Sequence, residues 1–103
     1  MQIDHGLSDK QLEIIKNVLV PFKDVIKSVG LFGSRATGKY RSNSDIDIVL
    51  YGTLDEQTAD RIFTLINDSG LPMKVDVQVY HLIAYPPLKT HIDSVMQQLY
   101  TND

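Results

Sequence analysis

The chain has 103 residues and a mass of 11.6 kDa, a size that predicts one hydrophobic core and excludes a second catalytic lobe. Hydrophobic residues make up 43% and charged residues 22%, which is typical of a folded globular protein. Ten basic and thirteen acidic residues give a net charge of −3, which argues against attraction of the whole protein to nucleic acid or to an anionic membrane.

Two further absences narrow the class of protein. The sequence has no cysteine, which excludes disulfides, Cys-ligated zinc and thiol catalysis. It shows no basic-then-apolar leader and no run near the roughly 18 apolar residues that a spanning helix needs. We therefore expect a cytoplasmic protein with no membrane association, folded as a single domain over residues 1–103.

A helix is predicted to begin at Ser8. Ser8 and Gln11 have the spacing of a capping box, and Leu7 is placed to pack on Leu12 as a hydrophobic staple. Apolar residues then recur at helical spacing until Pro21, which lacks a backbone donor and is expected to stop or kink the helix.

Two strands and a loop are expected next. Residues 25–32 are rich in β-branched side chains and predict a strand that ends at Gly33. Residues 33–44 have the polar, glycine-containing composition of a loop. Residues 45–51 predict a second strand, closed by Gly52.

The second half of the chain predicts a helix, a strand and a last helix. Thr53 or Asp55 can cap a helix that ends at Gly70, and residues 73–80 alternate as a half-buried strand does. The apolar stripe expected on the first of these helices is Ala59, Ile62, Phe63 and Ile66. After Pro86 and Pro87, the stripe expected on the last helix is Leu88, Ile92, Val95, Met96 and Leu99. The fold class is therefore α/β (α+β), a small mixed β-sheet packed by helices.

Three aspartates carry the strongest chemical signal. Asp45 and Asp47 stand at positions i and i+2 of a predicted strand, so both carboxylates project from one face. Like charges held together are unfavourable without a cation, and hard oxygen ligands suit Mg²⁺ or Mn²⁺. If the strand that carries Asp76 is a neighbour, three carboxylates converge and can hold two metal ions about 4 Å apart. The alternative is a solvated polar face, which for Asp76 alone is equally probable.

The junction before these aspartates suits phosphate. Gly33 allows close backbone approach, and exposed amides and the Ser34 hydroxyl can bind oxygen atoms. Arg35, Lys39 and Arg41 add local positive charge. The alternative interpretation is a mobile, solubilising loop.

A Walker A loop is a competing interpretation of the same segment. Gly33, Gly38 and Lys39 match the start of that motif after a strand. Tyr40 stands where the motif needs a Ser or Thr hydroxyl, and the chain continues through a loop into another strand instead of a helix. The Walker A interpretation therefore remains a minor alternative, because the motif lacks its structural context.

The spacing of these residues resembles that of a known family, the minimal nucleotidyltransferases (MNT) of the DNA polymerase β-like superfamily. The family signature is Gly-Ser, ten residues and then Asp-x-Asp, and this sequence has Gly33-Ser34, residues 35–44 and then Asp45-Ile46-Asp47. The flanking residues that also resemble the family are Leu31, Phe32, Ala36, Gly38, Ser44 and the segment Val75-Asp76-Val77. The resemblance covers nearly the whole chain.

The resemblance implies a polymerase β-like fold and a specific reaction. Asp45, Asp47 and Asp76 would be the catalytic and metal-binding residues for two Mg²⁺ ions, and Asp76 would help to activate an acceptor hydroxyl. The residues implied in binding ATP, the nucleotide donor, are Gly33, Ser34, Arg35, Lys39, Arg41 and Ser44. The resemblance also implies transfer of AMP to a partner protein, as antitoxin to a HEPN-domain ribonuclease toxin. A catalytically silent domain that inhibits its partner by binding is the rival interpretation.

The other candidate residues give weaker signals. His5, His81 and His91 show no spacing typical of metal ligands and are expected to be surface or packing residues. Tyr80 and Tyr85 could stack on a base, but tyrosines in a small domain more often lie at the rim of the core.

Overall fold

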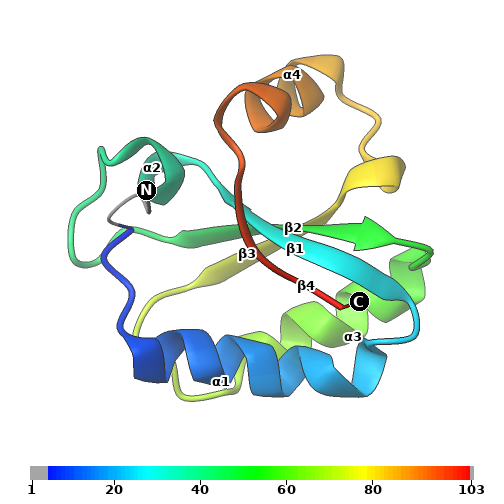
Figure 1. The fold of residues 1–103 in the computed structure, drawn as a ribbon, viewed down its shortest axis with the longest axis horizontal. Coiled ribbons are helices and arrows are strands. Elements are labelled where there is room, and N and C mark those ends of the chain that lie inside the picture. The colour runs from blue at the N-terminus through cyan, green and yellow to red at the C-terminus, as the bar shows by residue number, and fades with distance from the viewer. Residues whose placement is uncertain (1–4, 103) are drawn as a thin grey trace.

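The computed structural model describes residues 5–102, and it contains one four-stranded mixed sheet with the strand order β3-β2-β1-β4 (Figure 1). Strand β1 is antiparallel to both β2 and β4, whereas β2 and β3 are parallel. The helices are α1 (Asp9–Leu19), α2 (Ser34–Thr37), α3 (Glu56–Asn67) and α4 (Pro86–Val95), and the strands are β1 (Ile26–Phe32), β2 (Ile46–Gly52), β3 (Val75–Val79) and β4 (Gln97–Thr101). Residues 1–4 and 103 of the predicted domain lie outside the described residues.

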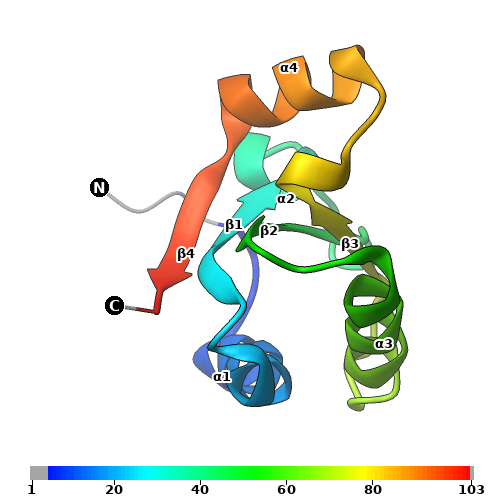
Figure 2. The same cartoon turned by 90° about the vertical axis from the view of Figure 1, so that its right-hand side faces the viewer.

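The helices divide between the two faces of the sheet. Figure 2 shows α1 and α3 together on one side, and α2 and α4 on the other. A mixed sheet covered by helices is the fold class that the sequence predicts, so that prediction is confirmed.

The first helix forms where its capping signals predict. The Ser8 hydroxyl accepts a hydrogen bond from the Gln11 amide at 3.1 Å, and the Gln11 side chain accepts one from the Ser8 amide at 3.0 Å. The helix ends at Leu19, and Pro21 lies in the short 3-10 turn Val20–Phe22 that follows. The capping box therefore satisfies the free amides at the start of α1, and the proline ends it.

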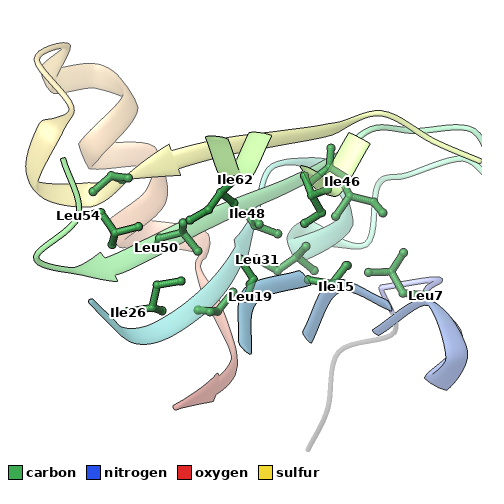
Figure 3. Packing of buried hydrophobic residues seen from close by; sticks show 14 of the residues in the cluster. Leu7, Ile15, Leu19, Ile26, Leu31, Ile46, Ile48, Leu50, Leu54 and Ile62 are labelled. Carbon is green, nitrogen blue, oxygen red and sulfur yellow. The ribbon is translucent and has the colours of Figure 1, made fainter. Parts of the chain in front are cut away.

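The main core lies between the sheet and the α1/α3 layer (Figure 3). Alternate residues of β2 supply it, because successive side chains of a strand point to opposite faces. The fully buried side chains that Figure 3 labels across this layer are Ile15, Leu19, Ile26, Leu31, Ile46, Ile48, Leu50, Leu54 and Ile62.

A smaller buried cluster lies under α4, on the other face of the sheet. It consists of Phe32, Val49 and Ile92, one residue each from β1, β2 and α4. Gly30 lies beside it, and a Cβ at that position would overlap the Met96 side chain. The glycine therefore leaves room for the Met96 side chain to pack on β1.

Strands β2 and β3 are parallel because α3 carries the chain back along the sheet between them. Asp55 caps this helix by accepting a hydrogen bond from the Thr58 amide at 2.8 Å. Ile62 and Ile66 are fully buried as predicted, but Phe63 is 38% exposed. The prediction was wrong for Phe63, because the stripe that contacts the sheet is narrower than the apolar stripe in the sequence.

Two elements differ from the sequence-based prediction. The last helix was expected to continue to Leu99, but α4 ends at Val95 and β4 pairs with β1. The segment 33–44 was expected to be a loop throughout, but Ser34–Thr37 forms a single helical turn. Gly38, at φ 79°, ends that turn in the left-handed conformation that glycine adopts without strain.

Across residues 5–102, no helix has both the length and the apolar character that crossing a bilayer requires.

Candidate active site

Two of the three predicted carboxylates lie side by side on the sheet. Asp47 of β2 and Asp76 of β3 are direct partners in the parallel register. Both are partly buried, whereas Asp45, just before β2, is exposed. Asp45 and Asp47 project to the side of the sheet that α2 and α4 cover. The side chain of Ile46, between them, points the other way, into the main core. The predicted neighbouring of the two strands is therefore confirmed.

Asp47 is in an environment that opposes its ionisation. Its pKa rises from 3.8 to about 6, first because burial removes water from the carboxylate and then because Asp76 and Asp45 add negative charge nearby. His91 and Lys74 lower this pKa by a smaller effect. A carboxylate that is half-buried between two others is stabilised by a cation, so the donor set fits a divalent metal ion.

The three carboxylates are not drawn tightly together. Within residues 5–102, no group of three His, Asp or Glu side chains is assembled closely enough to constitute a metal site. Asp47 and Asp76 are adjacent by register, and Asp45 is near enough to raise the pKa of Asp47. The residues that would hold the metal ions are therefore neighbours, although their side chains do not converge on one point.

The turn that follows β1 lies against the Asp-x-Asp strand. Gly33 has φ 72°, and a Cβ at this position would overlap the Asp47 carboxylate. Glycine suits this position because it adopts a positive φ without strain and has no Cβ that would collide with the Asp47 carboxylate. The next residue, Ser34, is partly exposed, and the turn begins with its amide and that of Arg35, before the Ala36 and Thr37 amides, which donate to the Gly33 carbonyl at 3.1 Å and 3.3 Å. The turn thus places a hydroxyl and backbone donors beside the carboxylates.

Arg35 is buried, although it was expected to be a phosphate-binding cation. Its side chain is 1% exposed and donates four hydrogen bonds to backbone carbonyls. The acceptors are the carbonyls of His5 at 2.8 Å, Ser42 at 3.3 Å and Ser44 at 3.0 Å and 3.2 Å. The guanidinium also lies 5.0 Å from the centre of the Tyr40 ring. These contacts differ from those of a phosphate ligand, and they make Arg35 the residue that holds the loop in shape.

Ser44 also takes part in the structure of this loop. Its hydroxyl accepts a hydrogen bond from the Arg41 amide at 2.8 Å, and its own amide donates to the Arg41 carbonyl at 3.0 Å. The side chains of Lys39 and Arg41 are exposed. These two cations are therefore accessible from solvent, whereas the polar groups of Ser44 close a tight turn just before Asp45.

Two basic residues near Asp47 were missed as site residues. Lys74 lies on the same face as Asp76. The alternating pattern of residues 73–80 predicted this shared face, but it did not indicate that Lys74 would lie near Asp47. His91 projects from α4, and only the packing of that helix brings it near Asp47. Spacing along the chain contains no signal for His91.

The tyrosines considered for base stacking have different surroundings. Tyr80 stacks on Tyr51 with ring centres 5.1 Å apart, and the Lys89 ammonium lies 4.8 Å from the centre of the Tyr80 ring. The Tyr80 hydroxyl donates to Asp93 at 2.8 Å. Tyr85 is 66% exposed. The contacts of Tyr80 tie α4 to the sheet.

Comparison with known proteins agrees with this geometry. Residues 13–103 match the family model described as "Polymerase beta, Nucleotidyltransferase". Among curated proteins, no sequence matches this chain.

Solved structures resemble the chain over most of its length. The crystal structure of a toxin-antitoxin with AMP-PNP has a TM-score of 0.72 at 25% identity, covering 87% of this chain and 73% of the other. A complex of a tri-AMPylated HEPN toxin with its MNT antitoxin, from Shewanella oneidensis, has a TM-score of 0.69 at 21% identity, covering 92% and 73%. A spectinomycin adenyltransferase from Enterococcus, with ATP and spectinomycin, has a TM-score of 0.63 at 12% identity, covering 94% and 57%.

The family model spans most of the chain, including the Gly33-Ser34 turn and all three aspartates. The solved structures with the higher TM-scores are complexes of antitoxins with toxins. The chain therefore belongs to the polymerase β nucleotidyltransferase family.

Proposed function

We propose that this chain, as a single minimal domain over residues 1–103, transfers AMP from ATP to a hydroxyl group of a partner protein in the cytoplasm. The observation that carries the proposal is the pairing of Asp47 with Asp76 beside the Gly33-Ser34 turn. This arrangement puts carboxylates for a metal next to backbone and hydroxyl donors for phosphate. It has the parts that phosphoryl transfer requires, which are positioning groups and groups that stabilise negative charge.

Each proposed step belongs to residues of this chain. Asp45, Asp47 and Asp76 would hold two Mg²⁺ ions, which when bound neutralise charge on the transferring phosphate and the leaving pyrophosphate. Gly33 and Ser34 bind the β- and γ-phosphates. Asp76 accepts the proton of the acceptor hydroxyl as that oxygen bonds to the α-phosphorus and the bond to pyrophosphate breaks.

The proposed acceptor is a HEPN-domain toxin, with this chain as its antitoxin. The solved neighbour that contains a tri-AMPylated HEPN toxin beside an MNT antitoxin supports this partner class. The net charge of −3 favours a protein acceptor over RNA or DNA, because few cations remain to follow a nucleic-acid backbone. Binding to a partner would also supply the orientation that the acceptor hydroxyl needs.

Radiolabelled ATP tests the transfer. The protein is incubated with Mg²⁺, an RNA pool, the co-expressed partner and ATP labelled at either the α- or the γ-phosphate. We expect label from the α-position on the partner protein and none from the γ-position, which separates nucleotide transfer from kinase activity. Asp45→Asn/Asp47→Asn should abolish the label, and Asp60→Asn, on the exposed side of α3, should not.

The other outcomes contradict the proposal in different ways. Label on RNA and never on protein would overturn the protein acceptor. Label on neither, with the partner still inhibited, would identify a catalytically silent domain that acts by binding. Mass spectrometry of the partner would show the added AMP and the acceptor residue.

A further inference from the structure

His91 lies on the helix that covers the carboxylate face of the sheet. Its neighbour Ile92 is fully buried and packs with Phe32 and Val49 in the smaller cluster. That packing fixes α4 over the end of β1, on the same side as α2 (Figure 2). The position of His91 is therefore set by a buried contact rather than by a flexible loop.

The imidazole of His91 lies at the junction of the two parts of the site. Its ring packs edge-to-face on Phe32, with centres 6.2 Å apart and an angle of 77° between the planes. Phe32 directly precedes Gly33, and it is the partner of Asp47 in the register of β1 and β2. Independently, the charge of His91 acts on Asp47, where it lowers the pKa. His91 thus lies beside both the metal-binding strand and the phosphate-binding turn.

The ring nitrogens of His91 are available to a ligand. The side chain is exposed, and within residues 5–102 neither nitrogen makes a hydrogen bond. An imidazole offers a donor N–H in both its neutral and its charged form. The Phe32 contact holds the ring through its apolar surface, as an aromatic pair does.

We propose that His91 is a further substrate-contacting residue, which donates a hydrogen bond to a phosphate oxygen of the nucleotide donor bound at the Gly33-Ser34 turn. The inference rests on the proposed function, because it assigns a ligand for the same site. It adds a contact supplied by α4. The alternative role is packing alone, in which His91 only helps to hold α4 on Phe32.

His91→Phe separates these two roles, because phenylalanine keeps the edge-to-face contact and removes the hydrogen bond. The measurement is calorimetric binding of AMP-PNP in the presence of Mg²⁺. We expect the variant to bind about 10- to 100-fold more weakly than the wild type, with an unchanged melting temperature. His81→Phe is the matched control, since His81 is exposed in the 3-10 turn Tyr80–Leu82, and it should bind as the wild type does.

Two more measurements use the same protein. His91→Gln keeps a side-chain donor and should recover part of the lost affinity. In proton NMR spectra, the imidazole signal assigned to His91 should shift when Mg²⁺-pyrophosphate is added, and the signal of His81 should not. Wild-type affinity of His91→Phe for AMP-PNP would overturn the inference and leave His91 as a packing residue.

The binding assay needs no acceptor, so its failure is distinct from failure of the proposed transfer. A chain that binds AMP-PNP through His91 but labels no partner would contradict the transfer alone. A chain that labels its partner while His91→Phe binds normally would contradict the His91 contact alone. Absence of AMP-PNP binding by the wild type would contradict both.

Discussion

Asp47 combines partial burial with two carboxylate neighbours, so its ionisation acts against folding. The folded state raises its pKa from 3.8 to about 6, so between these values the folded chain holds a proton that the unfolded chain has released. The stability that comes from this difference is therefore present below about pH 4 and is lost as the pH rises through about 6.

Asp47→Asn should remove this pH dependence. With EDTA present, we expect the variant to match the wild type near pH 4 and to be more stable by about 1 kcal/mol above pH 6.5, after discounting the shift for partial exposure. Urea unfolding at several pH values is the measurement, with Asp60→Asn as control. A stability difference that does not change with pH would contradict the assigned environment of Asp47.

Arg35 shows how a buried charged side chain can hold the shape of a loop through backbone carbonyls. Arg35→Lys loses the planar fork that donates four hydrogen bonds, and we expect it to destabilise the protein by about 2–4 kcal/mol. Lys39→Ala, at an exposed position of the same loop, should change stability by less than about 0.5 kcal/mol. Should Arg35→Lys unfold like the wild type and only bind ATP less well, the original expectation of a phosphate-binding cation would be restored.

Ser34 is expected to contribute more to the ligand than to the fold. Its side chain is partly exposed, so Ser34→Ala should leave the melting temperature nearly unchanged. One hydrogen bond to a charged phosphate contributes roughly 1.5–3 kcal/mol, so the affinity for AMP-PNP should fall by about one to two powers of ten. Ser94→Ala on α4 is the matched control. A large loss of stability at unchanged affinity would make Ser34 a structural residue.

At the scale of elements, the third helix shows which part of an apolar stripe makes contact. Ile62 is fully buried, and Ile62→Ala should cost about 2–5 kcal/mol of unfolding free energy. Phe63 is 38% exposed, and Phe63→Ala should cost less than about 1 kcal/mol. Chemical denaturation of both variants measures the difference. Equal losses would mean that Phe63 packs on the sheet as the sequence pattern suggested.

Elements with local signals could be predicted from the sequence. The Ser8–Gln11 capping box and the Asp55 cap act within one turn, and α1 and α3 begin where they predict. The alternation of side chains along extended backbone likewise predicts that Asp47 of β2 and Asp45 just before it project to the same face. Such features depend on neighbours in the sequence, and a single sequence contains them.

Elements that depend on distant partners could not be predicted in the same way. The last helix was predicted to continue to Leu99 because Met96 and Leu99 continue the stripe of α4, but pairing with the free edge of β1 makes Gln97–Thr101 a strand. Arg35 was expected to be a phosphate-binding cation, and its burial could not be predicted because its carbonyl partners come from three separate positions. His91 reaches Phe32 only through the packing of α4.

At the scale of the whole molecule, the single parallel pair in the sheet determines where the chemistry lies. The other two strand pairs are antiparallel, and only the α3 crossover brings the starts of β2 and β3 together. Asp47 and Asp76 are therefore neighbours although they are far apart in sequence. The α1/α3 layer covers the face of the sheet that holds the main hydrophobic core. The opposite face carries the aspartates, and exposed cations lie near them.

The contact of Arg35 with the His5 carbonyl joins the start of the described chain to a loop 30 residues later. Gly6, at φ 72°, lies against the Tyr40 ring in the same region, and the Leu7 amide donates to the His5 imidazole at 3.0 Å. A segment held by shared contacts opens as one cooperative unit. Residues 33–44 and residues 5–7, which precede α1, should therefore fluctuate together.

Hydrogen exchange makes this coupling measurable. The amides of Leu7, Arg41 and Ser44 should exchange with similar opening free energies, and Gly6→Ala should accelerate all three, because alanine at that backbone angle is strained against Tyr40. Protection of the Ile48 amide in the sheet should be unaffected. Faster exchange at Leu7 alone would show that the two segments move independently. If they move together, a change at Gly6 alters how often residues 33–44 open, although the two segments are distant in the sequence.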